Sequence, residues 1–258
     1  MGHPAAVGHR YLFVAGLHRS GTSLAARLAA SLPGAAGIDG APVPEQEGAY
    51  LTGALPHTAM HGRPGHFATD PAQHLVEGHP LDRLDTLLRL ERDWDPWFRP
   101  DAIWRVEKSP VNLVRMRLLQ SLLPLSQFVV VVRHPVAVAQ AVAKWTGEDV
   151  ATGVAYWEAA MAQVLGDLPY LHAALVLRYE DLVAAPGRAV ERLAAFTGLP
   201  PAPPGEAVRD GNRDYDLRWP VPPGPAARAL GYGEGPMSDA LAVRHPLRAV
   251  REAVMATL

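Results

Sequence analysis

The stretch "YLFVAGLHRSGTSLAARL", residues 11–28, decides the fold. It joins an apolar run of strand length to a helix-forming run through a loop bounded by Gly16 and Gly21. The spacing is that of the nucleotide loop G-x-x-x-x-G-K-[ST], except that Thr22 replaces the lysine and the nearest cation is Arg19. Backbone N–H groups at the start of such a helix favour an anion. The stretch therefore predicts a phosphate-like ligand at a site without the usual lysine.

Strand and helix patterns alternate along the rest of the chain. The β-branched run at 127–133 is the clearest strand, and such continuous runs are typical of parallel strands buried on both faces. Strands that alternate with helices predict a parallel sheet covered by helices on both sides. The other expected strands are 11–16, 102–108 and 173–179, and the expected helices are 21–32, 81–92, one from 110, one from 135, 151–168 and 186–198.

Four of the predicted helices carry apolar stripes. At 3.6 residues per turn, each stripe should face the core. The stripe of 81–92 consists of Leu81, Leu84, Leu87 and Leu88, with Glu91 at the same spacing, and that of the helix from 135 consists of Val138, Val142 and Trp145. The other two are Leu113, Met116, Leu119 and Leu123 in the helix from 110, and Val154, Trp157, Met161, Val164 and Leu168 in 151–168.

Two other stretches lack a periodic pattern. Residues 37–80 are rich in Gly, Pro and His, and so long a connection in a compact domain usually has a function. Residues 199–236 are rich in Pro and Gly, and a short terminal helix is expected at 246–258. We expect one domain over 1–258, with a core at about 11–200, a substrate-side loop at 37–80 and a tail at 199–258.

Composition narrows the classes of function. The chain has 258 residues, a formal net charge of −2 and no cysteine. The small net charge does not favour nucleic acid or an anionic membrane as a partner. The lack of cysteine excludes disulfides, thiolate metal sites and a cysteine nucleophile. No apolar run is long enough for a membrane span and the first ten residues lack a secretory signal, so a cytoplasmic protein is expected.

Polar side chains follow every predicted strand at its carboxyl end, where parallel sheets bind ligands. Each group alone could merely cap a helix or pair locally, but four groups around a glycine loop favour a shared site. They are Arg19, Gly21, Thr22 and Ser23 after the first strand, Glu107, Lys108 and Ser109 after the second, Arg133 and His134 after the third, and Tyr179, Glu180 and Asp181 after the last.

The cations at these strand ends indicate which anion is bound. A nucleoside triphosphate needs magnesium, usually held by an Asp at the end of an apolar strand, whereas the strand at 127–133 ends in Arg133. A second cation at this position suits a second phosphate elsewhere on the nucleotide. A sulfuryl group carries less charge than a terminal phosphoryl group, so protein cations can manage its transfer without a metal. The missing lysine at Thr22 fits this interpretation.

Four motifs, in order, resemble those of the sulfotransferases that use 3′-phosphoadenosine-5′-phosphosulfate (PAPS), particularly a bacterial branch close to the tyrosylprotein and Golgi-type enzymes. They are "RSGTS" (19–23), "EKSP" (107–110), "VVRHP" (131–135) and "RYEDL" (178–182). "PEQEGAYL" (44–51) is similar to an acidic stretch of bacterial relatives. The resemblance covers about residues 11–200. It implies an α/β, three-layer P-loop-type fold, with a central parallel sheet flanked by helices.

The resemblance also implies a role for each matching residue. Arg133 would bind the 3′-phosphate of PAPS, Tyr179 would lie against the adenine, and Lys108 would reach the transferred group. The 5′-phosphosulfate would be held by Arg19, Ser20, Gly21, Thr22 and Ser23.

Sulfuryl transfer to a hydroxyl needs cations on the leaving oxygen and a base for the acceptor proton. We assign Arg19 and Lys108 to the leaving oxygen. The acceptor is expected to be a small-molecule, glycan or lipid hydroxyl, which no residue identifies further, and the oligomeric state is likewise open. Glu47 is the first candidate for the base, and the alternatives are Asp39, Glu45 and a histidine such as His18.

Ala141 departs from the family pattern, which usually has a serine eight residues after the 3′-phosphate arginine. One lost hydrogen bond to a charged group costs about 1.5–3 kcal/mol, and we expect compensation from Lys144, Gln140 or Arg213. Two other functions stay open at this point. One is a P-loop small-molecule kinase, which would require magnesium, and the other is a non-catalytic nucleotide-binding relative.

Five histidines crowd residues 57–79, but their spacing is not that of zinc ligands. We therefore expect no metal site and expect these histidines to line the acceptor pocket. Three aromatic residues in "DWDPWFRP" (93–100) either stack on the acceptor or pack a helix end into the core. The histidines are His57, His61, His66, His74 and His79, and the aromatic residues are Trp94, Trp97 and Phe98.

Overall fold

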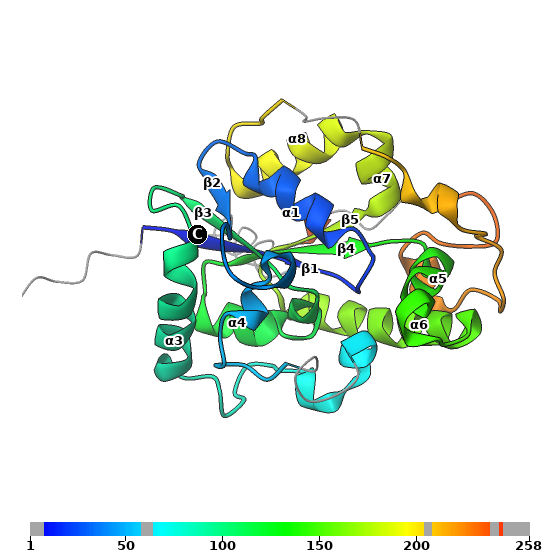
Figure 1. Cartoon of the computed structure of the whole chain (residues 1–258), viewed down its shortest axis with the longest axis horizontal. Coiled ribbons are helices and arrows are strands. Elements are labelled where there is room, and N and C mark those ends of the chain that lie inside the picture. The colour runs from blue at the N-terminus through cyan, green and yellow to red at the C-terminus, as the bar shows by residue number, and fades with distance from the viewer. Residues whose placement is uncertain (1–7, 58–63, 204–207, 238–242, 245–258) are drawn as a thin grey trace, which may run out of the picture.

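The computed structural model describes residues 8–57, 64–203, 208–237 and 243–244, and in them the chain forms one six-stranded sheet in the order β2-β3-β1-β4-β5-β6 (Figure 1). All pairs are parallel except β5 with β6. The predicted parallel sheet is confirmed, whereas β2 and β6 were not expected because each is too short to show a period. The strands are β1 (Arg10–Ala15), β2 (Ala35–Gly37), β3 (Trp104–Lys108), β4 (Gln127–Val132), β5 (Ala174–Arg178) and β6 (Val243–Arg244).

The described helices start and end at residues suited to those positions. Pro135 and Pro186 open α5 and α8 at the first helical position, and the carboxylate of Asp149 caps α6 by accepting from the Thr152 N–H. Gly198 ends α8 with a φ of 74°. The helices are α1 (Thr22–Ala30), α3 (Leu84–Trp94), α4 (Met116–Leu122), α5 (Pro135–Thr146), α6 (Val150–Asp167), α7 (Tyr179–Ala184), α8 (Pro186–Thr197) and α9 (Pro225–Ala229).

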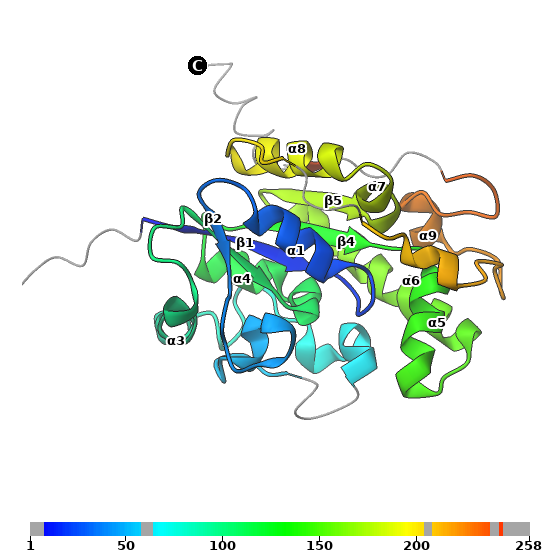
Figure 2. The same cartoon turned by 45° about the horizontal axis from the view of Figure 1, so that its top comes forward.

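Helices cover both faces of the sheet, which gives the predicted three layers (Figures 1 and 2). Alternate side chains of β1 enter the two cores, because successive strand residues point to opposite faces. Leu12 and Val14 pack with residues of α1 and α8, while Tyr11 and Phe13 pack with residues of α3, α4 and α6. The described residues contain no helix long and apolar enough to cross a membrane.

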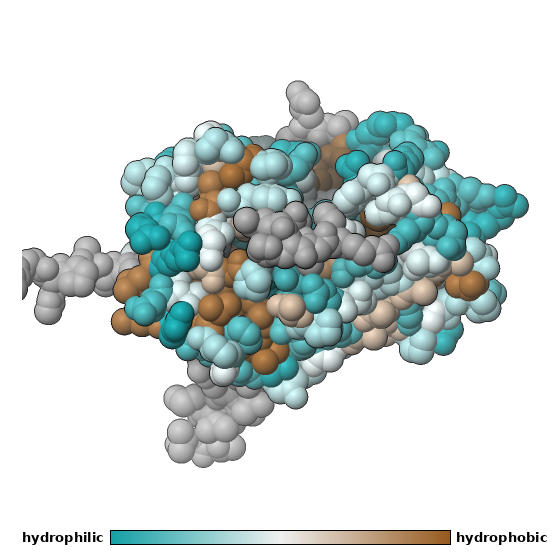
Figure 3. All heavy atoms as spheres, turned by 60° about the horizontal axis from the view of Figure 1, so that its bottom comes forward, coloured by the Kyte–Doolittle hydropathy of each residue, from teal (hydrophilic) through white to brown (hydrophobic). Residues whose placement is uncertain are grey.

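The predicted stripe of the helix at 81–92 is wrong for Leu84 and Leu88, whereas Leu81 and Leu87 are partly buried and pack against the core. In α3, Leu84 and Leu88 are 65% and 56% exposed, and the helix buries Thr86, Leu90 and Trp94 instead. Figure 3 shows hydrophobic atoms gathered on the surface at the end of the molecule where Figure 1 places α3. The periodicity of the sequence predicted the helix correctly, but it does not determine which face of the helix is covered by the rest of the chain.

The segment 37–80 has local structure where it is described. It contains only short 3₁₀ helices, which are too brief to show a period in the sequence. Residues 58–63 lie outside the described part, as does the helix predicted at 246–258. In the tail, α9 was not predicted. The 3₁₀ helices of the segment are Pro44–Gln46, Gly48–Tyr50, Pro64–Thr69 and Pro71–Gln73.

Candidate active site

The carboxyl ends of β1, β3, β4 and β5 meet at one edge of the sheet. Val14 of β1 pairs with Lys108, and Val132 of β4 pairs with Arg178, which precedes Tyr179. The loop between β1 and α1 is therefore flanked by the polar residues of the neighbouring strands. The structure brings the four predicted groups to one edge.

The loop of residues 16–21 has a conformation that depends on its glycines. A side chain at Gly16 would lie 2.6 Å from the Val131 carbonyl oxygen, and Gly21 has a φ of +97°. Arg19 also has a positive φ, of 67°, and its side chain is exposed. The loop leads directly into α1, a nine-residue helix. Its N-terminal N–H groups and dipole suit an anion.

Arg133 lies buried between the loop and the tail. Its Nη1 donates to the Arg19 carbonyl oxygen at 2.9 Å, and its Nε donates to Asn212 Oδ1 at 2.7 Å. Arg133 is thus a fixed, buried cation beside the loop, and its buried Nη2 amino group has no hydrogen-bond acceptor among the described residues.

Tyr179 packs against the same loop. A side chain at Gly21 would meet its ring at 2.6 Å, and the Arg133 guanidinium lies 4.3 Å from the ring centroid. The Gly211 N–H donates to the Tyr179 hydroxyl at 2.7 Å, so the tail closes over this ring. The sequence did not indicate this role of residues 209–212.

Lys108 and Glu47 form a buried ion pair at the end of β3, which we call the β3 pair. Lys108 Nζ donates to Glu47 Oε1 at 2.9 Å, and the residues are 6% and 7% exposed. Burial raises the pKa of Glu47, and the positive charge of Lys108 opposes that rise. A carboxylate with a raised pKa is a stronger base than an exposed one.

Glu107 holds the segment that carries Glu47. It is fully buried, and its carboxylate accepts from the Gly48 N–H at 2.9 Å and from Ser109 Oγ at 2.6 Å, as well as from Asn112 Nδ2. Burial raises the pKa of Glu107, which these donors oppose. Trp94 Nε1 donates to the Gly48 carbonyl oxygen at 2.9 Å. Glu107 thus pairs within the strand end and fixes the backbone beside Glu47.

The other two candidate bases differ from Glu47 in their surroundings. Asp39 and Glu45 are exposed. Both line a cavity of about 550 Å³ between α1 and residues 37–46, which Ser23 and Lys108 also line. This cavity connects the start of α1 to the β3 pair.

His18 lies in the loop between two aromatic rings. Its ring centroid is 5.3 Å from those of Phe67 and of Trp145. Burial, together with the positive charges of His57, Lys108 and Arg19, lowers the pKa of His18 to about 4. The imidazole is therefore neutral near pH 7.

The prediction that Trp145 faces the core is wrong, since Trp145 is 47% exposed.

The described histidines of 57–79 do not gather in one pocket. His66 bonds to Glu148 at 2.7 Å and His74 bonds to Asp167 at 2.9 Å. Among the described residues, no group of three His, Cys, Asp or Glu could hold a metal ion. His61 lies outside the described residues.

Trp94 and Phe98 pack into the core, 2% and 4% exposed, so packing rather than stacking on an acceptor explains their burial.

Ala141 is buried, and the described side chain that hydrogen-bonds to Arg133, Asn212, is none of the three expected to compensate for the missing serine. Arg213 is 84% exposed and lies 3.8 Å from the Asp210 carboxylate, whereas its neighbour Asn212 is buried against Arg133. Lys144 Nζ donates to the Tyr215 hydroxyl at 3.3 Å, and Gln140 Nε2 donates to the Asp216 carbonyl oxygen. The polar group that meets Arg133 is therefore an amide from the tail.

The family of the chain follows from the match of a family model. A model of the sulfotransferase family matches residues 12–203. A sulfotransferase from Mycobacterium tuberculosis H37Rv is similar at 18% identity, with 74% of this chain and 68% of that chain covered and a TM-score of 0.47. The sulfotransferase domain of an olefin synthase from Synechococcus is similar at 17% identity, with 96% and 94% covered and a TM-score of 0.44. The comparison with curated proteins found no match. Because the family match spans well over half of the sequence and includes the loop and all four strand ends, the chain belongs to the sulfotransferase family.

Proposed function

We propose that the protein transfers a sulfuryl group from PAPS to the hydroxyl of a small-molecule, glycan or lipid acceptor. The choice of PAPS as the donor rests on the burial and the hydrogen bonding of Arg133. This buried cation is held against the loop through the Arg19 carbonyl oxygen and keeps an unpartnered Nη2. A donor with phosphate at both ends of its ribose suits a loop and a second cation placed side by side.

Donor binding would use the loop and the residues beside it. The N–H groups at the start of α1, the hydroxyls of Ser20, Thr22 and Ser23 and the Arg19 side chain would hold the 5′-phosphosulfate, with Gly21 allowing the close approach. Arg133 would bind the 3′-phosphate. Tyr179, already packed on Gly21 and Arg133, would support the adenine side of the site.

The β3 pair would carry the proton and charge changes. The acceptor oxygen bonds to sulfur while the bond from sulfur to the 5′-phosphate oxygen breaks, and Glu47 takes the acceptor proton. Lys108 donates to the departing oxygen as its negative charge grows, together with Arg19. The 2.9 Å contact places the base and the cation side by side before the substrates arrive. Such positioning lowers the entropic part of the barrier.

Calorimetric titration of the unmutated protein tests the donor. We expect 3′,5′-bisphosphoadenosine to bind at least about tenfold more tightly than AMP, because only the bisphosphate reaches Arg133. ATP with Mg²⁺ should bind more weakly than the bisphosphate. Tighter binding of ATP–Mg²⁺ would contradict the proposal and favour a kinase. A radiolabelled transfer assay over an acceptor panel then tests the reaction itself.

A further inference from the structure

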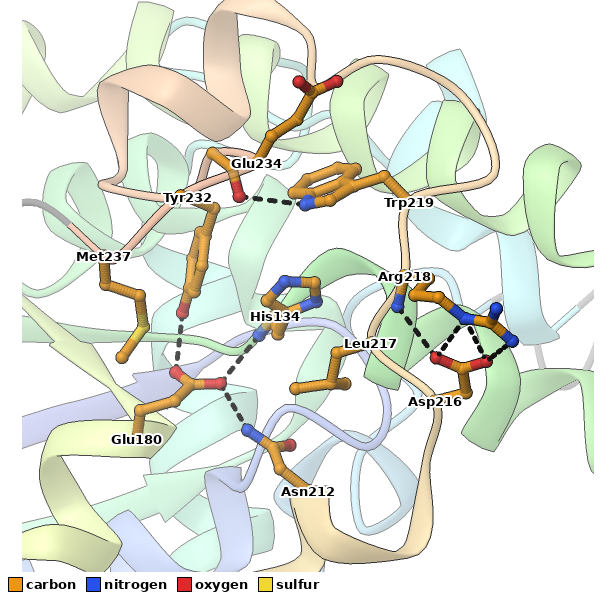
Figure 4. A pocket seen from close by; sticks show the side chains of 12 residues that line it. His134, Glu180, Asn212, Asp216, Leu217, Arg218, Trp219, Tyr232, Glu234 and Met237 are labelled. Atoms are coloured by element: carbon orange, nitrogen blue, oxygen red, sulfur yellow. Dashed lines mark hydrogen bonds and ion pairs between the residues drawn. The ribbon is translucent and has the colours of Figure 1, made fainter.

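A second cavity lies next to the ends of β4 and β5, and tail residues supply most of its lining (Figure 4). Its volume is about 640 Å³, which is enough for a small organic ligand. We call it the tail cavity. All of its lining except His134 and Glu180 comes from residues after 203, where the family match ends. The proposed donor and base residues, from the loop to the β3 pair and Arg133, do not line it.

Aromatic side chains form one wall of the tail cavity. The His134 ring centroid lies 5.1 Å from that of Trp219 and 5.6 Å from that of Tyr232, and Figure 4 shows the three rings grouped together. His134 is 9% exposed, and its Nδ1 has no hydrogen-bond partner among the described residues. Burial lowers the pKa of His134, so this wall is neutral near pH 7.

The charged groups of the tail cavity are mainly carboxylates. Glu180, Asp216 and Glu234 line it, and its one guanidinium, that of Arg218, is bound to Asp216 at 2.5 to 3.0 Å. The lining itself therefore has a net negative charge, which favours a cation over an anion, while the charge of Arg133 lies behind Asn212. The faces of aromatic rings also favour a cation.

The chemistry of the lining favours an organic cation over a metal ion. The described residues contain no group of three His, Cys, Asp or Glu placed to hold a metal. The Glu180 carboxylate is already engaged, because it accepts from the His134 N–H at 3.0 Å, Asn212 Nδ2 at 2.8 Å and the Tyr232 hydroxyl at 2.8 Å. A ligand would thus meet rings and a negative field rather than free oxygen ligands.

One side chain connects the tail cavity to Arg133. The Asn212 amide donates through Nδ2 to Glu180 and accepts through Oδ1 from Arg133 Nε. A ligand that moves Glu180 would therefore move the amide that holds the guanidinium. No other described side chain is hydrogen-bonded to both residues.

We propose that the tail cavity binds a small organic cation with a flat apolar body, and that its occupancy changes anion binding at Arg133 through Asn212. The first part does not rest on the proposed sulfuryl transfer, since it can be tested without a sulfate donor. The second part uses only the affinity for a bisphosphate.

Ligand-observed NMR and calorimetry with three probes of similar size test the first part. We expect benzyltrimethylammonium to bind about tenfold or more tightly than benzyl alcohol or benzoate. Trp219→Ala should weaken the binding of benzyltrimethylammonium by about tenfold. Tyr170→Ala, which removes an exposed ring elsewhere, should leave that affinity unchanged. Glu234→Gln alters an exposed side chain and keeps its shape. Glu234→Gln should weaken the binding of benzyltrimethylammonium but not that of benzyl alcohol. Glu191→Gln on α8 is the control and should change neither affinity.

Two results would overturn the cation site. One is equal or tighter binding of benzoate, and the other is undetectable binding of all three probes. Complete mutual exclusion between the cation and 3′,5′-bisphosphoadenosine would also overturn it, because the cavity would then be part of the donor site.

The link to Arg133 has its own measurement. Saturating benzyltrimethylammonium should change the affinity for 3′,5′-bisphosphoadenosine by about threefold or more, and Asn212→Ala should abolish that change. An unchanged affinity in the unmutated protein, or the same change in Asn212→Ala, would overturn the link.

Discussion

The ends of β3 and β4 flank the loop, and each carries one buried cation that is satisfied in a different way. Lys108 at the end of β3 is paired with the buried carboxylate of Glu47. In the described part of the chain, Arg133 after β4 donates hydrogen bonds only to neutral oxygens, those of Arg19 and Asn212. A cation already neutralised by a carboxylate has little field left for a ligand, whereas one held by neutral dipoles keeps its charge for an anion.

This difference separates the two tasks of the proposed site. The β4 end would bind a fixed anion throughout the reaction. The β3 end would exchange a proton and respond to charge that develops during transfer. Four predictions follow, from the largest expected effect to the smallest, and the first three test that separation.

Glu47→Gln is expected to have the largest effect, on turnover. The amide keeps size and polarity but cannot take the acceptor proton, so transfer should fall by about 10²- to 10⁴-fold. Binding of 3′,5′-bisphosphoadenosine should persist. A radiolabelled transfer assay measures the rate and titration calorimetry the binding.

Glu45→Gln and Asp39→Asn are the matched controls, because both carboxylates are exposed. If turnover stayed near normal in Glu47→Gln but was largely lost in one of the controls, the carboxylate changed in that control would be the base. Near-normal turnover in all three would favour His18.

Lys108→Met is expected to destabilise the fold, because it leaves the Glu47 carboxylate buried and unpaired. Breaking a buried pair from one side costs about 3–5 kcal/mol of unfolding free energy. The double variant Lys108→Met/Glu47→Gln should recover part of that loss. Urea unfolding measures both, and Arg133→Met is the comparison, since no described carboxylate forms an ion pair with Arg133. Equal losses in Lys108→Met and Arg133→Met would remove the distinction between the two ends.

Arg133→Ala should reduce the binding free energy of 3′,5′-bisphosphoadenosine by about 2–3 kcal/mol, which is a loss of affinity of roughly 30- to 150-fold. AMP binding should change little because AMP lacks the 3′-phosphate. Arg213→Ala serves as the control, since its side chain is 84% exposed and lies in the same tail segment. Similar losses for the bisphosphate and AMP, measured by calorimetry, would show that Arg133 supports the loop rather than the 3′-phosphate.

The smallest effect concerns the pH dependence of stability. Burial and the charge of Arg115 lower the pKa of His57 from 6.5 to about 4. Between about pH 4 and 6.5, the unfolded chain therefore binds more protons at this residue, and the unfolding free energy rises with pH at up to about 1.4 kcal/mol per unit. This stability is complete above pH 6.5 and is lost as the pH falls towards 4.

His57→Gln should reduce that slope over the same window, measured by urea unfolding at several pH values. The raised pKa values of Glu47 and Glu107 act in the opposite direction, since their contribution falls as the pH rises above 4.5. The comparison of His57→Gln with the unmutated protein isolates the histidine, because both proteins retain these carboxyls. An unchanged slope would show that His57 titrates normally.

The strand ends could be predicted because their signals are local. The β-branched run before Arg133 and the glycine spacing around Arg19 depend on neighbours in the chain, and the edge that gathers them follows from parallel strand geometry. Contacts between distant segments have no such signal. Asn212 lies 79 residues from Arg133, and Gly48 lies 59 residues from Glu107. Neither pair belongs to a periodic pattern.

The choice among candidate bases shows the same limit. Asp39, Glu45 and Glu47 stand in one irregular segment, and their spacing does not rank them. The structure buries only Glu47 of these three, beside Lys108, because Glu107, Ser109 and Trp94 bind the backbone of residues 48–49. The histidines of 57–79 likewise looked alike in sequence, and the described ones have separate partners.

By itself, the sequence determined the parallel sheet, the loop at its centre and the identity of the residues that follow each strand, because these depend on local periodicity and short-range spacing. Only the tertiary structure decided which cation is neutralised, which carboxylate is buried and that the tail supplies the amide on Arg133. Burial and charge pairing depend on segments far apart in the chain. Their energies come from the exclusion of water by many neighbours at once, which no short stretch of sequence encodes.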